Sequence, residues 1–398
     1  MATPDGLFFT GSDIVDQLLQ EALRAVRTHL GLEVAFISQF TAGRRVFLYV
    51  DSDSGFSPLR VGDGDPLEQS FCQRVVDGRL PPLICDARDH AEAMTLAVTT
   101  QLPVGAHLSV PISMDGKAFG TFCCFSRKGR TSLDGKDLAL VRCYANFVSR
   151  IFAKISRERQ KVLERHTRIR EVLDGRLYRM VYQPIIRIDT GQITGHEALA
   201  RFTAEPQRSP DKWFNQAAEV GLQDELELAV IRRALADLEQ IPGGSYVSFN
   251  ISPQTILGHP DLHVFDGHAL GRIMLEVTEH ASIDDYGVIA DTLAQHRRRG
   301  LRLAVDDAGA GYASFRHILK LKPDVIKLDT TLVAEIDKDN GMRALAAAIV
   351  HFAEETGAKV VAEGIETEQE LRALRALGIT NGQGFLLGRP NPLASPAM

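Results

Sequence analysis

The first 150 residues alternate between helical and strand-like hydrophobic patterns. A helical repeat of apolar residues is followed by two strand-like stretches at 33–40 and 44–50, joined by a turn at Gly43. Two more strands are expected at 106–112 and 117–126, where Asp115-Gly116 supplies a hairpin turn. This order predicts an antiparallel sheet with helices packed on it, an α+β domain over residues 1–150.

Residues 133–174 predict one long helix with a seven-residue apolar repeat. The repeat comprises Val141, Val148, Ile155, Val162 and Ile169, with Tyr144, Ile151 and Val172 at the matching second position. Such a repeat favours two helices wound around each other. We therefore favour a connector between two copies of the chain, with residues 151–174 as a helical linker. In the alternative, the first half of the helix packs on its own domain and its charged middle is only a linker.

From Tyr178 onward, short apolar segments alternate with amphipathic helical segments. About eight strands in about 220 residues, in strand–helix order, are typical of a TIM-like (β/α)8 barrel with parallel strands. We therefore predict an α/β barrel domain over residues 175–398, with its site at the carboxyl ends of the strands. The expected strands are 180–186, 193–199, 246–251, 273–277, 301–305, 325–328, 359–362 and 384–387.

Composition and charge describe an ordinary globular protein and exclude several functions. The net charge is −6, and no basic cluster predicts a nucleic-acid polymer as partner. No apolar stretch approaches the ~20 residues that span a bilayer, and the N-terminus does not resemble a signal peptide. All five cysteines lie in the first 150 residues, without the spacing of a disulfide framework. Reduced thiols and a cytoplasmic location are expected.

Polar residues gather at the ends of the predicted barrel strands. Each alone has an ordinary explanation as a helix cap or a rim charge, but their repetition at one end of most strands indicates a site. They are Glu197, Asn250, Glu276, Glu279, Asp306, Asp307, Lys327, Glu363 and Glu366. Oxygen ligands suit Mg²⁺ or Mn²⁺ rather than zinc, and there are enough carboxylates for two ions bridged by Asp306. Paired metals of this kind serve attack on a phosphodiester, and Lys327 could orient the attacking water.

The second half resembles the signature of EAL-domain phosphodiesterases, which hydrolyse the bacterial messenger cyclic di-GMP. The match begins at Glu197-Ala198-Leu199, followed by Arg201, and covers residues 177–392. The other motifs are Tyr182-Gln183-Pro184, Asn250-Ile251-Ser252, Glu276-Val277-Thr278-Glu279, Asp306-Asp307, Ile326-Lys327-Leu328-Asp329, Glu363-Gly364-Ile365-Glu366 and Gln383-Gly384. By this resemblance, the reaction opens one phosphodiester of the ring to give linear pGpG.

The resemblance also implies a role for each matching residue. The expected metal ligands are Glu197, Asn250, Glu276 and Asp306 for one cation, and Asp306, Asp307 and Glu363 for the other. Lys327 would contact the attacking water, and Glu363 could instead act as general base. The expected substrate contacts are Gln183, Leu199 and Arg201, and the expected supporting residues are Glu279, Glu366 and Gln383.

Two stretches depart from the family's pattern. Ala308 and Ala310 stand where members usually carry Phe and a hydroxyl residue, in a loop tied to metal loading and dimer contacts, and residues 202–209 lack the usual His-Pro. Because no liganding position is missing, we favour an active enzyme, inhibited by Ca²⁺ because its looser coordination fits such a site poorly. The alternative is a catalytically weak or inactive receptor that binds cyclic di-GMP.

The first domain resembles a GAF domain, chiefly at 106–112 and 120–126. This resemblance implies a sensory or dimerising module with an unknown small-molecule ligand, and hence a homodimer. Cys123 and Cys124 are neighbours on a strand and face opposite sides, so they are unsuited to share one metal ion. Four residues could line a pocket, but we expect buried core thiols and hydrogen-bonded histidines instead; they are Cys72, Cys85, His90 and His107.

Overall fold

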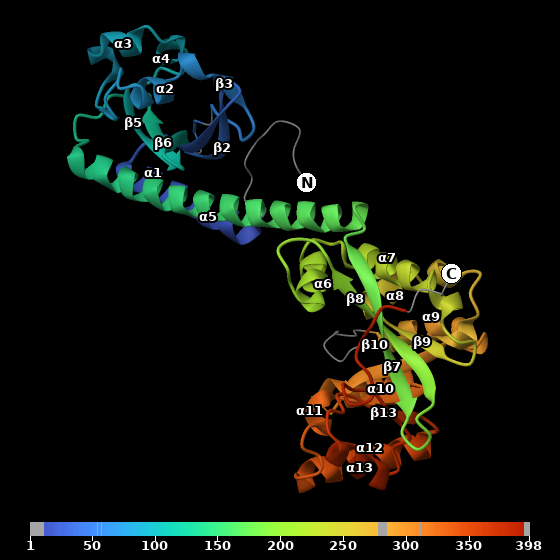
Figure 1. Cartoon of the computed structure of the whole chain (residues 1–398). Coiled ribbons are helices and arrows are strands. Elements are labelled where there is room, and N and C mark those ends of the chain that lie inside the picture. Colours follow the sequence, from blue (N-terminus) through green and yellow to red (C-terminus); the bar gives the residue numbers. More distant parts are fainter. Residues whose placement is uncertain (1–11, 54, 57, 278–284, 310–311, 394–398) are drawn as a thin grey trace. The chain divides into compact units, whose positions relative to one another are not determined.

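The computed structural model describes residues 12–393, apart from 54, 57, 278–284 and 310–311, and gives only the backbone of 312–314. These residues form two compact units, one up to Lys161 and one from Val162 onward, whose elements are labelled in Figure 1. Among the helices in the described ranges, none combines the length and hydropathy that crossing a bilayer requires.

The first unit is a six-stranded antiparallel sheet with helices on both faces, which confirms the predicted α+β domain. One face packs against α1 (Asp13–Leu30) and the first part of α5 (Gly135–Asp174), and the other packs against α2, α3 and α4. The strand order is β3-β2-β1-β6-β5-β4. The remaining bounds are β1 Val34–Thr41, β2 Arg44–Ser52, β3 Gly64–Pro66, α2 Phe71–Val76, β4 Leu83–Ile84, α3 Ala91–Met94, α4 Ala97–Gln101, β5 Ala106–Met114 and β6 Lys117–Ser126.

Both ends of the apolar repeat of α5 are buried within the separate units, so the repeat does not form the predicted continuous seam between two chains. Val141 and Val148 are fully buried in the core shared with α1, whereas Ile169 and Val172 are fully buried in the core of the second unit. Between them, the Val162 residue is 47% exposed. The prediction of a seam along this stripe was therefore wrong, because each end of the stripe is covered by its own unit. The alternative, in which the first half of the helix packs on its own domain, is confirmed.

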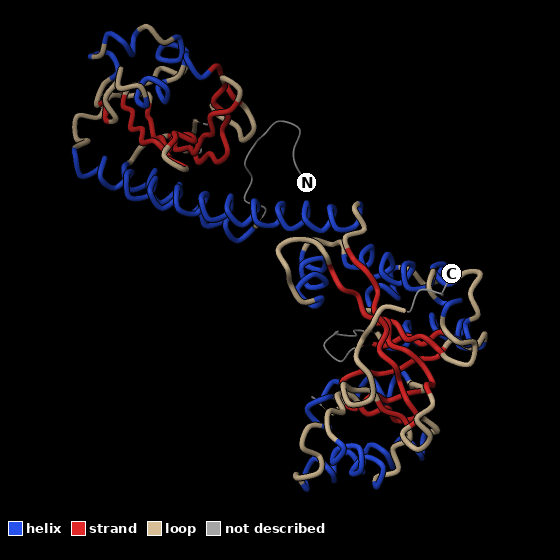
Figure 2. The backbone as a smooth tube through the Cα atoms, viewed as in Figure 1, coloured by secondary structure: helices blue, strands red, loops and turns tan. Residues whose placement is uncertain are grey.

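The second unit is a closed eight-stranded barrel with helices around it, which confirms the TIM-like fold (Figure 2). The strand order is β10-β11-β12-β13-β14-β7-β8-β9. The strands are β7 Tyr178–Arg187, β8 Ile193–Phe202, β9 Tyr246–Asn250, β10 Ile273–Val277, β11 Arg302–Ala308, β12 Val325–Leu328, β13 Lys359–Ala362 and β14 Asn381–Gly382. The helices are α6 Pro210–Glu219, α7 Gln223–Leu235, α8 Pro253–Gly258, α9 Tyr286–Arg298, α10 Tyr312–Leu321, α11 Thr330–Val333, α12 Asn340–Thr356 and α13 Glu368–Ala376.

Two features of the barrel differ from the prediction. Strand β7 runs antiparallel to both neighbours, β8 and β14, so the strands are not all parallel. The reason is the short connection at 188–192, which suffices for a hairpin, whereas a parallel crossover needs a dozen or more residues. The last strand is Asn381–Gly382, and the predicted strand at 384–387 is a turn.

Inside the barrel, an apolar layer lies next to a polar layer. The apolar layer consists of Ile185, Tyr246, Met274, Ala304, Val325 and Val361. On β8, Gly195 makes room for it, because a Cβ there would lie 2.5 Å from the ring of Tyr246. Side chains two residues apart on a strand share a face, so the residues two positions further along point inward as well. In this way the fold places Glu197, Glu276, Asp306, Lys327 and Glu363 in one layer.

The burial of the α5 stripe leads to a stability prediction. Ile169→Ala should lower the free energy of unfolding of the barrel by about 2–5 kcal/mol, because it leaves a cavity in the core. Val162→Ala, at the preceding position of the same repeat, should change it by less than about 0.5 kcal/mol. Denaturant unfolding followed by the fluorescence of Trp213, the only tryptophan and fully buried in the barrel, measures both. Equal losses that depend on protein concentration would instead indicate a seam between chains.

Candidate active site

Lys327, on β12, lies at the centre of the polar layer. Its residue is 1% exposed, and its Nζ is 2.6 Å from Glu363 Oε1, 2.7 Å from Glu276 Oε2 and 3.2 Å from Asp306 Oδ1. A fourth carboxylate oxygen, Oε2 of Glu197, lies 3.9 Å away. Four strands and the segment after β13 thus bring five ionisable groups together from across the barrel. The predicted convergence of these residues is present in the structure.

The charges in this layer do not balance. One ammonium group faces four carboxylates, so three negative charges remain uncompensated if all four are ionised. Burial raises the pKa of Glu276 to about 8 even though the charge of Lys327 lowers it, and burial likewise raises the pKa of Asp306 and Glu363. Burial alone lowers the pKa of Lys327. The negative charges of the carboxylates, that of Asp306 most of all, outweigh this effect, and the pKa of Lys327 is raised. The layer therefore holds extra protons or binds cations.

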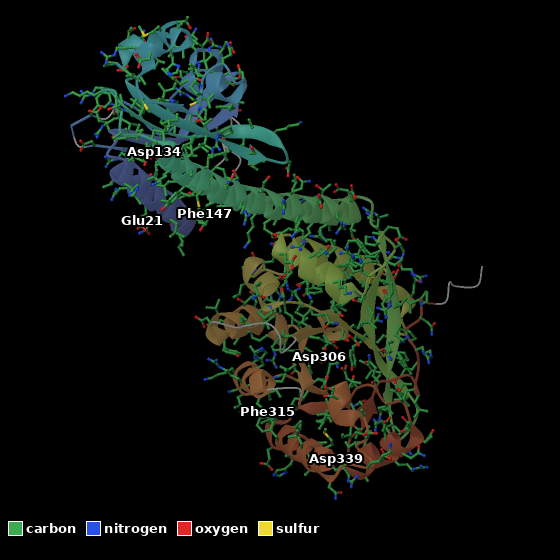
Figure 3. All side chains as sticks on the ribbon, turned by 90° about the vertical axis from the view of Figure 1, so that its left-hand side faces the viewer. Glu21, Asp134, Phe147, Asp306, Phe315 and Asp339 are labelled. Carbon is green, nitrogen blue, oxygen red and sulfur yellow. The ribbon has the colours of Figure 1, made fainter. Side chains whose placement is uncertain are left out.

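The carboxylates of Asp306 and Asp307 both lie in one acidic cluster, as their place at a strand end predicted. Oxygens of Asp306, Asp307 and Glu363 lie within 4.8 Å of one another, a spacing that could hold a metal ion. Two neighbours on a regular strand would face opposite sides. Here Asp307 has a φ of 58°, the pairing of β11 with β12 is shifted after Val305, and the Asp307 N–H donates to Asp306 Oδ1 at 3.0 Å. This left-handed conformation, which costs about 1–2 kcal/mol, turns the second carboxylate toward the site. Figure 3 labels Asp306 on the barrel.

A chain of amide groups orients the carboxylate of Glu197. Asn250 Nδ2 donates to Glu197 Oε1 at 3.1 Å, and Gln383 Nε2 donates to Glu197 Oε2 at 2.5 Å. Gln383 Nε2 also donates to Gln183 Oε1 at 3.0 Å, and Gln183 Nε2 donates to the Gly388 carbonyl at 3.1 Å. Two predicted residues, Asn250 and Gln383, thus bind the same carboxylate, and a third, Gln183, is connected to it through Gln383.

The remaining predicted residues lie further from this cluster or outside the described residues. Leu199 and Arg201 lie two and four residues after Glu197 on β8. The guanidinium Nη1 of Arg201 donates to the backbone carbonyl of Ala200 at 2.8 Å. Glu366 is exposed, and its backbone N–H donates to Glu370. Glu279 and Ala310 lie outside the described residues, whereas Ala308 is buried at the end of β11.

Two supporting positions were not predicted. Glu227, on α7, is buried and accepts hydrogen bonds from Ser252 N at 2.9 Å and Ser252 Oγ at 3.0 Å, which holds the segment just after Asn250. Its sequence signal is an acid among the apolar residues 226–231. Gly364, next to Glu363, has a φ of 67°, and a Cβ there would lie 2.4 Å from Thr330 Cγ2. Glycine therefore allows the chain to turn directly after Glu363.

A family model for the EAL domain matches residues 166–390, more than half of the chain. The chain belongs to the EAL domain family. A family model for the GAF domain matches residues 15–152, so both resemblances noted in the sequence are confirmed.

Relatives of the EAL domain include proteins named for cyclic di-GMP hydrolysis. Cyclic di-GMP phosphodiesterase NbdA of Pseudomonas aeruginosa is 31% identical over 245 residues, covering 58% of this chain and 31% of the relative. Probable cyclic di-GMP phosphodiesterase PdeB of Escherichia coli is 30% identical over 260 residues, and the match covers 62% of this chain and 48% of the relative. The solved structure of PaMucR phosphodiesterase in complex with c-di-GMP is 27% identical, with a TM-score of 0.51, and the match covers 57% of this chain and 98% of that one. The chain spans about a third of the length of several curated relatives.

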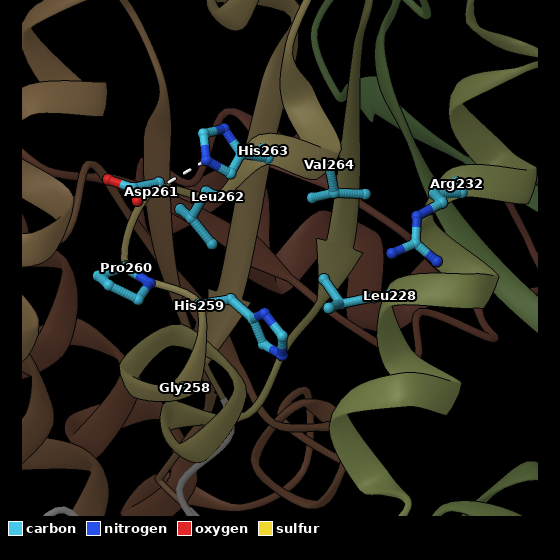
Figure 4. Close-up of a pocket in the computed structure, with 9 residues that line it drawn as sticks. All are labelled: Leu228, Arg232, Gly258, His259, Pro260, Asp261, Leu262, His263 and Val264. Atoms are coloured by element: carbon cyan, nitrogen blue, oxygen red, sulfur yellow. Dashed lines mark ion pairs between the residues drawn. The ribbon is translucent and has the colours of Figure 1, made fainter.

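A separate pocket on the EAL domain lies away from the acidic layer. It has a volume of about 220 Å³ and is lined by Leu228, Arg232 and residues 258–264 (Figure 4). None of the described site residues lines it. Two of its polar groups lie close together, with His263 Nε2 3.7 Å from Asp261 Oδ2. The converging carboxylates, and not this pocket, are therefore the candidate active site.

The raised carboxyl pKa values predict how stability depends on pH. A carboxyl group whose pKa is higher in the folded state favours folding below its ordinary pKa of 4.5, and this contribution is lost as pH rises through the folded value. With a metal chelator present, the barrel should therefore lose stability between about pH 5 and pH 8, by up to about 1.4 kcal/mol per pH unit for each group. Denaturant unfolding read from Trp213 fluorescence measures this slope.

Matched variants locate the source of the slope. Glu276→Gln should flatten it, because the amide does not titrate, whereas Glu368→Gln, at an exposed residue of α13, should leave it unchanged. A slope of opposite sign in the unmutated chain would contradict the charge imbalance.

Proposed function

We propose that the EAL domain of this chain hydrolyses cyclic di-GMP to linear pGpG with two divalent cations, Mg²⁺ or Mn²⁺. The observation that carries the proposal is the convergence of Glu276, Asp306 and Glu363 on buried Lys327. Relatives named as cyclic di-GMP phosphodiesterases support the choice of substrate. The match of every liganding position to the family motifs supports an active enzyme.

The residues of the site fit hard divalent cations. The cluster that could hold a metal consists of the carboxylates of Asp306, Asp307 and Glu363, and oxygen ligands are those that Mg²⁺ and Mn²⁺ prefer. The surplus of negative charge around Lys327 favours cation binding as well. The proposed ligand sets are Glu197, Asn250, Glu276 and Asp306 for one cation, and Asp306, Asp307 and Glu363 for the other. When bound, such cations supply charge neutralisation at the phosphodiester and lower the pKa of a nearby water.

Lys327 and Glu363 are the proposed catalytic residues. Protonated Lys327 presents a hydrogen-bond donor and a positive charge where negative charge develops on the phosphate. Glu363 is placed to accept a proton from the attacking water. That water adds to phosphorus, one bond between phosphorus and a ribose oxygen breaks, and the released oxygen takes up a proton, so the ring opens. Arg201 is proposed to bind a phosphate through its guanidinium, and Gln183 and Leu199 to contact the rest of the substrate.

A turnover assay tests the proposal. The purified chain with cyclic di-GMP and Mg²⁺ should release pGpG, which chromatography separates from the substrate. Glu363→Gln should lower kcat by at least about 100-fold, because the amide can neither accept the proton nor supply the negative charge. Glu368→Gln, which changes an exposed acid of α13, should leave kcat unchanged. A chelator should stop turnover, Mg²⁺ or Mn²⁺ should restore it, and Ca²⁺ should not.

The same assay separates the enzyme from the alternative receptor. Binding of cyclic di-GMP by the unmutated chain without release of pGpG would show a receptor. Normal turnover by Glu363→Gln would contradict the assigned site while leaving the activity in place.

The proposal extends to the setting of this activity. We propose a cytoplasmic homodimer, with an unidentified small molecule as the GAF ligand and the division 1–150, 151–174 and 175–398 between sensory domain, linker and barrel. The free cysteines of the described residues support a reducing compartment. The two ends of the α5 stripe are buried in their own units and are not available for the dimer interface.

We also propose that the GAF domain regulates the barrel through α5. This helix is continuous from Gly135 to Asp174, its early residues belong to the core of the first unit and its last residues to the core of the second. A helix whose ends are fixed in two cores can carry a small shift of one end to the other.

A pair of matched variants tests this coupling. Gln160 and Lys161 lie on an exposed part of α5. Replacing both with glycine should weaken the helix by about 2 kcal/mol relative to replacing both with alanine. The glycine pair should change kcat or KM for cyclic di-GMP, and the alanine pair should not. Identical kinetics for the two variants would contradict regulation through α5.

A further inference from the structure

The core of the GAF domain contains two cysteine thiols in direct contact. Cys72 lies on α2 and Cys123 on β6, and their sulfur atoms are 3.2 Å apart. Both residues are fully buried, in the core between the sheet and the helices α2, α3 and α4. A disulfide bond is about 2.05 Å long, so the two sulfur atoms need to approach by only about 1 Å to bond.

A buried arginine lies against one of these thiols. The Arg45 residue is 5% exposed, and its Nη1 donates to Cys72 Sγ at 3.0 Å. Its other side-chain N–H groups bind the carboxylate of Asp65, the residue opposite Arg45 on β3. Its guanidinium also lies over the rings of Phe36 and Phe47, with centroid distances of 5.3 and 4.9 Å. The positive charge is thus fixed beside Cys72, and the 34% exposed side chain of Asp65 connects this group to the surface.

The surroundings make the two thiols different. Burial raises the pKa of Cys72, but the hydrogen bond from Cys123 and the charge of Arg45 outweigh it, and its pKa is lowered. Burial and the neighbouring Cys72 raise the pKa of Cys123, whose thiol lies 3.1 Å from Ser109 Oγ and 3.2 Å from Thr121 Oγ1. His107, whose ring centroid lies 4.8 Å from that of Phe71, stays neutral, because burial and then Arg45 lower its pKa. One thiol is therefore prepared as a nucleophile and the other stays protonated.

We propose that Cys72 and Cys123 form a reversible dithiol–disulfide site that reacts with hydroperoxides. The Cys72 thiolate attacks a peroxide oxygen, the O–O bond breaks, and the released hydroxide takes up a proton, which leaves Cys72 as a sulfenic acid. Cys123 then attacks the Cys72 sulfur, and the hydroxyl leaves as water with the Cys123 proton. In total, two thiols and one hydrogen peroxide give one disulfide and two waters, and the sulfurs lose two electrons.

Cys124 provides a built-in comparison. It is equally buried but faces the opposite side of β6, in the core shared with α1 and α5. Burial raises its pKa, and its surroundings lack the contact with Arg45 that Cys72 makes. A difference in reactivity between Cys72 and Cys124 therefore reports the local chemistry, not the depth of burial.

Mass spectrometry of the full chain tests the proposal. The reduced protein is treated with equimolar hydrogen peroxide at pH 7, remaining thiols are alkylated, and the protein is digested without reductant. A peptide containing Cys72 should be linked to one containing Cys123, two hydrogens lighter than their sum, and thiol reductants should reverse the link. Cys124→Ser should form the same link. Cys123→Ser should instead leave Cys72 as a sulfenic acid that dimedone traps.

A second measurement does not depend on the folding of any variant. In the unmutated chain at pH 7, iodoacetamide should label Cys72 at least about tenfold faster than Cys124, because only Cys72 is largely a thiolate. The proposal is overturned if Cys72 and Cys123 both remain fully alkylatable while the exposed Cys143 is oxidised by peroxide. Equal labelling rates of Cys72 and Cys124 would overturn it as well.

Discussion

The buried ammonium group of Lys327 is the constraint on which the chemistry of the barrel depends. Removing a charged group from water costs several kcal/mol, which only nearby opposite charges and hydrogen bonds can offset. Glu276, Asp306 and Glu363 provide them at 2.6–3.2 Å. The negative charge of these carboxylates, when ionised, is larger than the single positive charge of Lys327. Their mutual repulsion therefore disfavours the folded barrel at neutral pH. The same surplus of negative charge favours the binding of the proposed cations, so the proposed function and the stability of the barrel oppose each other at this site.

The rest of the barrel serves to hold this layer in place. An apolar layer two residues earlier on most strands, with Tyr246 packed over Gly195, supports the charged groups on one side and excludes water there. The shifted pairing and positive φ at Asp307 bring a second neighbouring carboxylate inward, and Gly364 lets the chain turn directly after Glu363. Glu227 binds the segment after Asn250 from outside the barrel. The strained backbone at Asp307 therefore occurs where it positions a charged side chain in the site.

The sequence predicted the barrel and the convergence of its acids because both depend on local patterns. Strand–helix alternation indicates a barrel, and side chains at one end of its strands must lie close together, so Glu276, Asp306 and Glu363 could be named in advance. The direction of β7 was missed because an apolar run does not encode strand direction, although the short connection at 188–192 does. The two residues of β14 are too few to show a period. The seven-residue repeat of α5 predicts an apolar stripe on the helix, but it does not indicate which part of the protein covers that stripe.

Contacts between distant segments could not be predicted where neither a motif nor the strand pattern connects them. Cys72 and Arg45 are 27 residues apart, and Cys72 and Cys123 are 51 apart, without a motif that connects them. The sequence pattern favoured ordinary core thiols, and only the packing of α2 against β2 and β6 shows that a charge lies beside one of them. Likewise, Glu227 appeared only as an acid on an apolar helix face until Ser252 was placed beside it.

The most direct test of the central claim is the stability of Lys327→Met in the presence of a chelator. Lys359→Met, the same change at an exposed position of the neighbouring strand β13, is its control. Unfolding at pH 7.5, read from Trp213 fluorescence, should show a loss of about 3–5 kcal/mol for Lys327→Met, because the carboxylates remain buried without their partner. The control should change by less than about 0.5 kcal/mol. If Lys327→Met is as stable as the unmutated chain, the buried ammonium does not hold the acidic layer together.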